Sequence, residues 1–455
     1  MTEGVLRLEY KPRSYFVPFH NRLKYHKVDG VKRLRPDSLL RACLVCHRGA
    51  GKTVACVVDL IDAAIKCSFP RGRFAIIGPT LKQEKTNAWD YMRDYALRLQ
   101  SKEVHVEINE TELRVDFGHN QSRVRIFGSD NPDNLRGQYF DGVVFDEYAD
   151  IDPRIWPEIV LPRLGDPGRD LGWVVFIGTP RGHNSFYQIH TNAIKDPKWF
   201  YMMLKAADSN LHSVEQLEAI KAEQTPEQYA QEFECSFEAA IQGAYYAKLM
   251  EAALTSGRIC SVPHNPDFPV FTAWDLGWSD ATAIIFAQVV GREIHIIDYI
   301  EASHKPLGYY VGELRERADF VYEGHFLPHD VMVSEQGTGK TRLETLQTLG
   351  LNNCRVLLKH EIPDGINAVR QLIPRCVFDK TKCLRLTEAL SLYRSDLDLR
   401  QIDPTTRQPI LKDRPKRDWT THPADAMRYL AAGIDERGMR GFWKPIEYKG
   451  DRSIV

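Results

Sequence analysis

The feature that most constrains this chain is a short apolar run that breaks into a glycine-containing turn and resumes as an apolar-rich helical pattern. The run and turn cover residues 41–53, and the helical pattern covers residues 54–65. A strand, such a turn and a helix opening with Gly-Lys-Thr cradle nucleotide phosphates, because backbone N–H groups and the helix N-terminus face the anion. The alternative is a plain strand-to-helix turn, since Cys46 stands where the usual pattern has its first glycine.

The candidate nucleotide-binding residues of this turn are Arg48, Gly49, Ala50, Gly51, Lys52 and Thr53. Lys52 is expected to reach the β- and γ-phosphates of ATP, and Thr53 to hold Mg²⁺. A second Gly-Lys-Thr ends residues 335–341 and is a rival. The residues that follow each Gly-Lys-Thr indicate which of the two is the nucleotide site.

Two acids follow the first turn at the end of a buried-strand pattern, in residues 141–148. Asp146 suits a carboxylate that orders Mg²⁺, and Glu147 suits one that polarises the attacking water. No such pair follows Lys340 within the length of a domain. The first site is therefore predicted to be the ATPase centre, and residues 335–341 to act through a flexible backbone or through Lys340.

Two further elements are candidates for contacts with ATP. Thr179 leaves a predicted strand at the same edge as Asp146 and is placed to sense the γ-phosphate, although a Gly-Thr-Pro turn without function is an equal alternative. Phe16 and Phe19 lie in an aromatic segment that could stack on the adenine ring. Packing of that segment on the domain explains the composition equally well.

Strands that alternate with helical patterns predict an α/β domain with a mostly parallel sheet, whose ligand crevice lies at the carboxyl ends of the strands. Residues 213–216 and 225–228 carry helix-start signatures, which predict a small helical lid. The pattern weakens and prolines gather over residues 244–268. A domain boundary is expected there.

Three aspartates from separate elements of the C-terminal half are candidate metal ligands. Asp275 lies inside an apolar strand, where a carboxylate is costly to bury unless a cation meets it. Asp330 ends an apolar run, and Asp425 lies in the first turn of a predicted helix. Any one of them could be a cap or an ion-pair partner. Together, with Asp280 beside them, they predict the two-metal Mg²⁺ or Mn²⁺ site of phosphodiester cleavage.

Bulk composition places limits on the partners. Lys+Arg 60 against Asp+Glu 61 gives a formal net charge of −1, so binding to nucleic acid must come from local basic patches. Nine scattered cysteines argue against a disulfide framework and for a reducing compartment. No apolar run reaches the length of a membrane span, and the N-terminus lacks a signal-peptide pattern. A soluble intracellular protein is expected.

The order and spacing of these motifs resemble the large terminase subunit of tailed bacteriophages, the motor that packages DNA. The motifs are the turn ending in Gly-Lys-Thr, Val-Val-Phe-Asp-Glu at 143–147, Trp-Asp-Leu-Gly at 274–277, Pro-His-Asp at 328–330 and His-Pro-Ala-Asp-Ala at 422–426. The resemblance covers about residues 15–435. It implies a P-loop ATPase of the ASCE type joined to a nuclease of RNase H-like fold.

By this resemblance, Arg48 contacts the γ-phosphate, Glu147 is the catalytic acid, Thr179 couples hydrolysis to movement, and Asp275, Asp330 and Asp425 form the nuclease triad. The implied domains are an ATPase at 1–209, a helical lid at 210–243, a linker at 244–268, a nuclease at 269–435 and a tail at 436–455 that engages the portal.

The implied function is ATP-driven translocation of concatemeric double-stranded DNA into the procapsid, with metal-dependent cutting at the genome ends. The implied partners are DNA, the portal protein and the small terminase subunit. The chain would be a monomer in solution and a ring, expected to be a pentamer, on the portal. It would act in the host cytoplasm and be absent from the mature virion. A helicase or remodelling ATPase with a nuclease domain and a non-catalytic ATP-binding scaffold remain alternatives.

Overall fold

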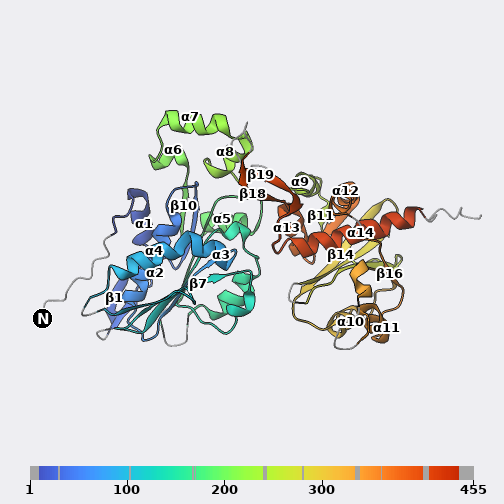
Figure 1. Cartoon of the computed structure of the whole chain (residues 1–455), viewed down its shortest axis with the longest axis horizontal. Helices are drawn as coiled ribbons and strands as arrows, with labels where there is room; N and C mark the ends of the chain where they lie inside the picture. Colours follow the sequence, from blue (N-terminus) through green and yellow to red (C-terminus); the bar gives the residue numbers. More distant parts are fainter. Residues whose placement is uncertain are drawn as a thin grey trace, which may run out of the picture. The chain divides into compact units, whose positions relative to one another are not determined.

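The computed structural model divides the chain into two compact units, one formed by residues 1–242 with 402–408 and the other by residues 243–401 with 409–455 (Figure 1). It describes residues 10–28, 31–101, 104–165, 169, 171–238, 243–278, 281–333, 339–359, 361–402 and 409–439. Each unit is described by itself. Within these residues, every helix is too short or too polar to cross a membrane.

The first unit is built on an eight-stranded sheet in the order β10-β3-β9-β8-β4-β7-β6-β5. Its strands from β10 to β7 are parallel, and β6 and β5 continue it antiparallel. The bounds are β3 Arg41–Cys46, β4 Arg73–Gly78, β5 Val106–Asn109, β6 Arg114–Phe117, β7 Ser122–Gly128, β8 Gly142–Phe145, β9 Trp173–Gly178 and β10 Trp199–Leu204. A separate hairpin joins β1 Tyr25–Val28 to β2 Val31–Leu34.

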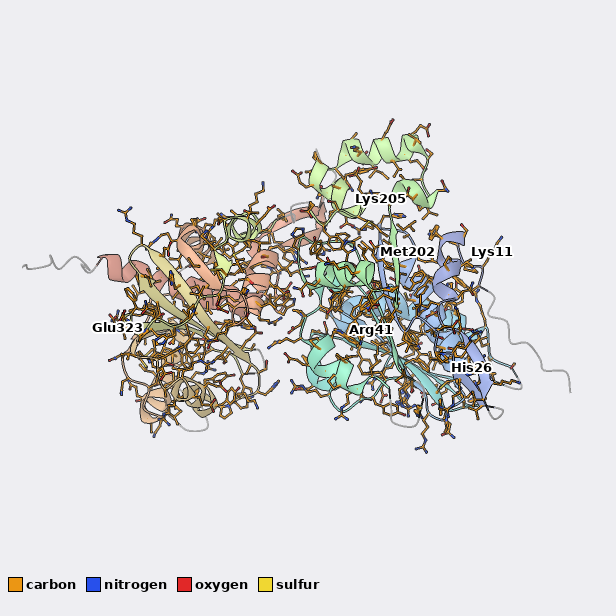
Figure 2. The ribbon with its side chains drawn as sticks, turned by 180° about the vertical axis from the view of Figure 1, so that it is seen from behind. Lys11, His26, Arg41, Met202, Lys205 and Glu323 are labelled. Carbon is orange, nitrogen blue, oxygen red and sulfur yellow. The ribbon has the colours of Figure 1, made fainter. Side chains whose placement is uncertain are left out.

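Apolar clusters cover both faces of this sheet, as the α/β prediction requires. One cluster joins the even positions of β3 to helices α2 and α4, and the other joins its odd positions to α5 and the aromatic residues after β8. Figure 2 marks Arg41 at the start of β3 and Met202 on the adjacent β10. The helices are α1 Val17–His20, α2 Lys52–Lys66, α3 Leu81–Glu84, α4 Asp90–Leu97 and α5 Ser185–Lys195, with π-helical turns at Lys85–Trp89 and Ile155–Val160.

Three short helices follow β10, and the two predicted helix starts are confirmed among them. They are α6 Ala206–Ser209, α7 Val214–Glu223 and α8 Pro226–Glu232 (Figure 1). Ser213 with Gln216, and Thr225 with Gln228, form reciprocal capping boxes. Each box satisfies two backbone N–H groups that a helix N-terminus otherwise leaves without partners.

The second unit is built on a seven-stranded sheet in the order β11-β17-β14-β13-β12-β15-β16. β12, β13 and β14 form an antiparallel meander, and β15 and β16 add parallel to β12. This mixed sheet confirms the predicted α/β class for the second unit. The strands are β11 Ile259–Cys260, β12 Val270–Asp275, β13 Thr282–Val290, β14 Glu293–Ala302, β15 Tyr322–Leu327, β16 Cys354–Val356 and β17 Cys376–Asp379, with a hairpin of β18 Ser395–Ile402 and β19 Pro409–Pro415.

Helices pack on both faces of the second sheet, and α14 lies against β12 and β13. Figure 1 labels α14 and the other helices of this unit. The helices are α9 Ala247–Thr255, α10 Leu307–Glu316, α11 Arg342–Thr348, α12 Ile362–Leu372, α13 Leu384–Leu392 and α14 Thr421–Met439. The predicted linker at 244–268 contains α9 and β11. Tyr246 and Met250 from this segment are buried in the core of the second unit. The predicted tail begins inside α14, and its residues 440–455 lie outside the described part of the chain.

A buried polar network ties β12 to β15, the two strands that lead to Asp275 and Asp330. Trp274 Nε1 donates to Thr272 Oγ1 at 2.6 Å, and the Thr272 hydroxyl lies 2.6 Å from His325 Nδ1. After accepting from Trp274, the Thr272 hydroxyl still has its proton and a second lone pair, so the tautomer of His325 sets the direction of the hydrogen bond to Nδ1. Burial lowers the pKa of His325 from 6.5 to about 4.

This network predicts a loss of stability in acid. The unfolded chain binds a proton at His325 before the folded chain does, so the stabilisation present near neutral pH is lost as pH falls from about 6.5 toward 4. Each unit of pKa difference corresponds to about 1.4 kcal/mol. Urea unfolding between pH 7 and 4.5 should show a shallower pH dependence for His325→Gln than for the wild type. His26→Gln, at an exposed histidine on β1, should match the wild type. Equal slopes for all three proteins would contradict the assignment.

Candidate active sites

The candidate phosphate loop of the first unit is the predicted turn between β3 and α2. Gly49 and Gly51 have φ of 82° and 85°, in the left-handed region that glycine adopts without steric cost. Gly51 is the N-cap of α2, and Lys52 is its first residue. The N-terminus of α2 therefore opens on the loop, as an anion site requires. Exposed Arg48 donates its backbone N–H to Glu232 O at 2.9 Å, which joins the loop to the end of α8.

Two N-terminal side chains hold the outside of this loop. Arg13 Nη1 donates to Ala50 O at 2.7 Å, and the Tyr15 hydroxyl donates to the same oxygen at 3.0 Å. Two donors on one carbonyl fix the orientation of the Ala50–Gly51 peptide. Sequence reasoning singled out this aromatic segment but missed Arg13.

Phe16 and Phe19, expected beside the adenine ring, are placed in the core instead. Their exposed fractions are 1% and 0%. Phe19 also lies under the Arg22 guanidinium, 4.1 Å from the ring centroid. Neither ring has a free face for a base, so the structure gives the stacking prediction no support. The packing alternative describes both residues.

The other predicted nucleotide-site residues come together at the carboxyl edge of the sheet. Lys52 Nζ lies 3.0 Å from Glu147 Oε1. Thr53 Oγ1 donates to Asp146 Oδ2 at 2.8 Å. Thr179 Oγ1 donates to Glu147 Oε2 at 3.4 Å. The ends of β8 and β9 and the start of α2 thus place these five side chains in one polar cluster.

Burial sets the electrostatics of this cluster. Burial, together with the charge of Glu147, raises the pKa of Asp146 to about 6, against the opposing effect of Lys52. Burial also opposes ionisation of Glu147, but its ion pair with Lys52 holds the pKa of Glu147 below the ordinary value. Glu147 has a φ of 51°, unusual for a residue with a side chain and typical of strained functional positions.

The residues present fit Mg²⁺. Asp146 and Thr53 offer two hard oxygens that contact each other, and Mg²⁺ in nucleotide sites is usually held by one or two protein oxygens with waters and phosphates. Among the described residues, no three His, Cys, Asp or Glu side chains are grouped closely enough to hold a metal by themselves. A site completed by phosphate oxygens agrees with that finding.

The second Gly-Lys-Thr has a structural use. Thr341 is the N-cap of α11, and its side chain forms a capping box with Glu344. α11 has 7 residues and ends at Thr348. Residues 334–338 lie outside the described part of the chain.

The three predicted carboxylates of the second unit stand at adjacent positions of the fold. Asp275 ends β12, Asp330 lies in the helical turn His329–Met332 after the neighbouring β15, and Asp425 lies near the start of α14. Burial and the negative charges of Asp275, Asp425 and Asp330 together raise the pKa of Tyr429, so all three acids act on one hydroxyl. Asp280 lies outside the described residues.

Basic partners that sequence reasoning missed meet two of these acids. His422 Nδ1 lies 2.8 Å from Asp275 Oδ2, and Arg428 Nη2 donates to Asp425 Oδ1 at 2.6 Å. Asp330 Oδ1 is buried and has no hydrogen-bond partner among the described residues. Arg428 was open to prediction, because residues three apart in a helix share a face. His422 stands in the motif that contains Asp425, but its contact with Asp275 depends on the tertiary fold.

Like the acids of the first unit, these carboxylates are not grouped closely enough among the described residues to hold a metal by themselves, although the charge of Asp275 acts on Asp425. Burial first, and then the charge of Asp275, raises the pKa of Asp425 to about 6, although Arg428 and His422 oppose the shift. A bound cation would offset that repulsion. Carboxylate oxygens suit Mg²⁺ and Mn²⁺.

Residues 44–253 match the family described as "Terminase large subunit, T4likevirus-type, N-terminal". The predicted resemblance to phage large terminase subunits is confirmed. Two relatives named "Terminase, large subunit", from Thermus phage G20c and Thermus virus P23-45, are each 29% identical over 188 residues. That stretch is 38% of this chain and 36% of each relative, so the chain matches only about a third of their length.

Solved large terminases also resemble the chain, at lower identity. The large terminase ATPase domain of Thermus phage P74-26 is 23% identical, with a TM-score of 0.39 over 43% of this chain and 88% of that one. The HK97 bacteriophage large terminase is 12% identical, with a TM-score of 0.42 over 88% and 92%. The P22 large terminase nuclease domain is 18% identical, with a TM-score of 0.29 over 41% and 94%. With TM-scores below 0.5, these structures carry no argument about the candidate sites.

Asp330 and Asp425 differ in their hydrogen-bond partners, so their replacement by alanine is predicted to have opposite effects on the stability of the metal-free protein. In EDTA, Asp330→Ala should leave the melting temperature unchanged or raise it, because it removes a buried carboxylate oxygen, Oδ1, that has no hydrogen-bond partner among the described residues. Asp425→Ala should lower it, since the change leaves the partly buried Arg428 guanidinium without this carboxylate partner. Asp319→Ala, at an exposed acid of the same unit, serves as the control. Destabilisation by Asp330→Ala with none by Asp425→Ala would reverse the assignment.

Proposed function

We propose that this chain is the large subunit of a viral terminase, which uses ATP to translocate concatemeric double-stranded DNA into a procapsid and cuts it in a metal-dependent reaction. The observation that carries the proposal is the buried Lys52–Glu147 pair beside the Thr53–Asp146 hydrogen bond. A loop that binds phosphate and an acid that can activate water are thereby held within one cluster. The family match over residues 44–253 supports the same reading.

In the ATPase reaction, Lys52 exchanges Glu147 for the β- and γ-phosphate oxygens of ATP. The loop N–H groups and the N-terminus of α2 bind the same phosphates. Released from Lys52, Glu147 accepts a hydrogen bond from the attacking water and orients it toward the γ-phosphorus. Thr53 and Asp146 would hold Mg²⁺, which neutralises phosphate charge when bound.

Thr179 and Arg48 have supporting roles in this proposal. The Thr179 hydroxyl donates a hydrogen bond to Glu147. Thr179 would therefore respond when Glu147 leaves Lys52, and in this way couple hydrolysis to movement. Exposed Arg48 reaches the γ-phosphate from the loop, and its backbone contact with Glu232 transmits the state of the loop to α8. Residues 1–209 form the ATPase in this account, and residues 210–243 form the lid.

In the nuclease reaction, Asp275, Asp330 and Asp425 would hold divalent ions, which would supply Lewis-acid activation of the phosphodiester. His422 and Arg428 keep two of these acids in place. The basic residues Lys412, Arg414, Lys416 and Arg417 would contact DNA phosphates, which give affinity without sequence information. The nuclease would include α9 and β11, which belong to the second unit.

The assembly follows from the resemblance to terminases. The proposed partners are double-stranded DNA, the portal protein of the procapsid and the small terminase subunit. We propose a monomer in solution that forms a pentameric ring on the portal, in the host cytoplasm, and leaves before the virion matures. The tail at 436–455 would engage the portal.

The ATPase assignment predicts different defects at Glu147 and Lys52. Glu147→Gln should retain nucleotide binding but lower turnover by about 100-fold or more, because a positioned proton acceptor contributes about 10²–10⁴-fold. Lys52→Ala should weaken both binding and turnover. Steady-state phosphate release and equilibrium binding of fluorescent ADP measure the two separately. Lys340→Ala, in the other Gly-Lys-Thr, should behave as wild type. Normal turnover in Glu147→Gln would refute the assignment.

The nuclease assignment predicts that cutting depends on the three acids and on added metal. Full-length protein should nick plasmid DNA with Mn²⁺ or Mg²⁺ and lose this activity in Asp275→Asn, Asp330→Asn and Asp425→Asn. ATP hydrolysis should persist in all three variants, because their ligands lie in the other unit. Asp319→Asn should cut normally. Undiminished plasmid cleavage by Asp330→Asn, or cleavage in EDTA, would exclude this site.

A further inference from the structure

Glu84 is a buried carboxylate that none of the steps above uses. It ends α3, which begins directly after β4, and β4 is the neighbour of β8, the strand that leads to Asp146. The start of α3 is fixed by Thr80, whose side chain accepts from Gln83 N at 3.1 Å. Glu84 therefore lies at the same edge of the sheet as the two acids of the nucleotide site.

Two glycines make room for this carboxylate. A Cβ at Gly78, the last residue of β4, would overlap the Glu84 carboxylate oxygen Oε2. A Cβ at Gly128, the residue paired with Gly78 on β7, would overlap the backbone of Leu81 at the start of α3. The strand ends thus lack side chains where the helix and its acid approach most closely.

Glu84 is buried and has no partner among the described residues. Its exposed fraction is 0%, and neither carboxylate oxygen has a hydrogen-bond partner within that part of the chain. Burial, and then the charges of Asp146 and Glu147, raise the pKa of Glu84 well above the ordinary value. A buried acid costs free energy unless another group compensates it. The two acids that act on Glu84 are the functional pair of the nucleotide site.

Charge in this region is unbalanced before nucleotide binds. Glu84, Asp146 and Glu147 contribute three carboxylates, and the cation in direct contact with them among the described side chains is Lys52, which pairs with Glu147. The three acids are not grouped closely enough to hold a metal directly. Mg²⁺ keeps several of its waters when it binds a nucleotide site, and these waters need acceptors. The two oxygens of Glu84 are acceptors to which no described residue donates.

We propose that Glu84 is a third acid of the nucleotide site, whose carboxylate accepts hydrogen bonds from the waters of the nucleotide-bound Mg²⁺. This inference rests on the proposed ATPase function. Glu84 is a positioning residue here, because it acts on the metal through water and does not touch the nucleotide.

The test is the Mg²⁺ dependence of nucleotide binding by the full chain. Fluorescent ADP is titrated at fixed concentration with Mg²⁺, for the wild type and for Glu84→Gln, which keeps the size of the side chain but removes the charge. The Mg²⁺ concentration at half-saturation should rise about tenfold in the variant, since loss of an outer-shell partner typically lowers metal affinity 10–100-fold. Glu84→Ala should show the same shift. Glu158→Gln, at an exposed acid of the same unit, should show none.

A second measurement separates this role from a purely structural one. The melting temperature in EDTA should rise in Glu84→Gln, because an amide is neutral in both the unfolded and the folded chain and so avoids the cost of burying or protonating the acid. A structural role moves only that temperature, so an unchanged Mg²⁺ dependence in a folded Glu84→Gln or Glu84→Ala would overturn the inference while the ATPase proposal stands. Failure of the wild type to bind fluorescent ADP at any Mg²⁺ concentration would overturn both.

Discussion

The ion pair between Lys52 and Glu147 is the interaction on which the first unit's site depends. It joins the first residue of α2 to a residue just beyond the end of β8, and so it connects the phosphate loop to the acids at the sheet edge. Removal of either partner would lower the stability of the protein, because a buried charge without its partner costs about 3–5 kcal/mol of folding free energy. A phosphate group is a substitute partner for Lys52. In the proposed reaction, binding of nucleotide would therefore free Glu147 without leaving the lysine uncompensated.

Both units gather more carboxylates than cations at the ends of their strands. In the first unit, Glu147 pairs with Lys52, while the Glu84 oxygens have no hydrogen-bond partner among the described residues. In the second unit, His422 and Arg428 meet Asp275 and Asp425, and Asp330 Oδ1 has no such partner within the described ranges. In the proposed function, a bound divalent cation would relieve the repulsion between the carboxylates of each site. In the second unit, the Trp274–Thr272–His325 network ties together β12 and β15, the strands that lead to Asp275 and Asp330.

Features that depend on residues close together in the sequence could be predicted. The phosphate loop, the acids at 146 and 147 and the two capping boxes each depend on residues close in sequence, whose spacing reflects backbone geometry. The contacts of Arg13 with Ala50, of His422 with Asp275 and of Gly78 with Glu84 depend on which strands become neighbours, which no local pattern records. Phe16 and Phe19 show the same limit, since an aromatic side chain suits a core and a base equally well. The proline-rich stretch 244–268 resembled a linker, yet it contributes a helix and a strand to the second unit.

The most direct test of the central claim is a crystal structure of the chain with Mg²⁺ and a non-hydrolysable ATP analogue. The account predicts that Lys52 Nζ leaves Glu147 Oε1, now 3.0 Å away, and contacts a phosphate oxygen, with a water within hydrogen-bond distance of the freed carboxylate. An analogue bound away from the loop between β3 and α2, or an intact Lys52–Glu147 pair beside bound phosphates, would contradict it.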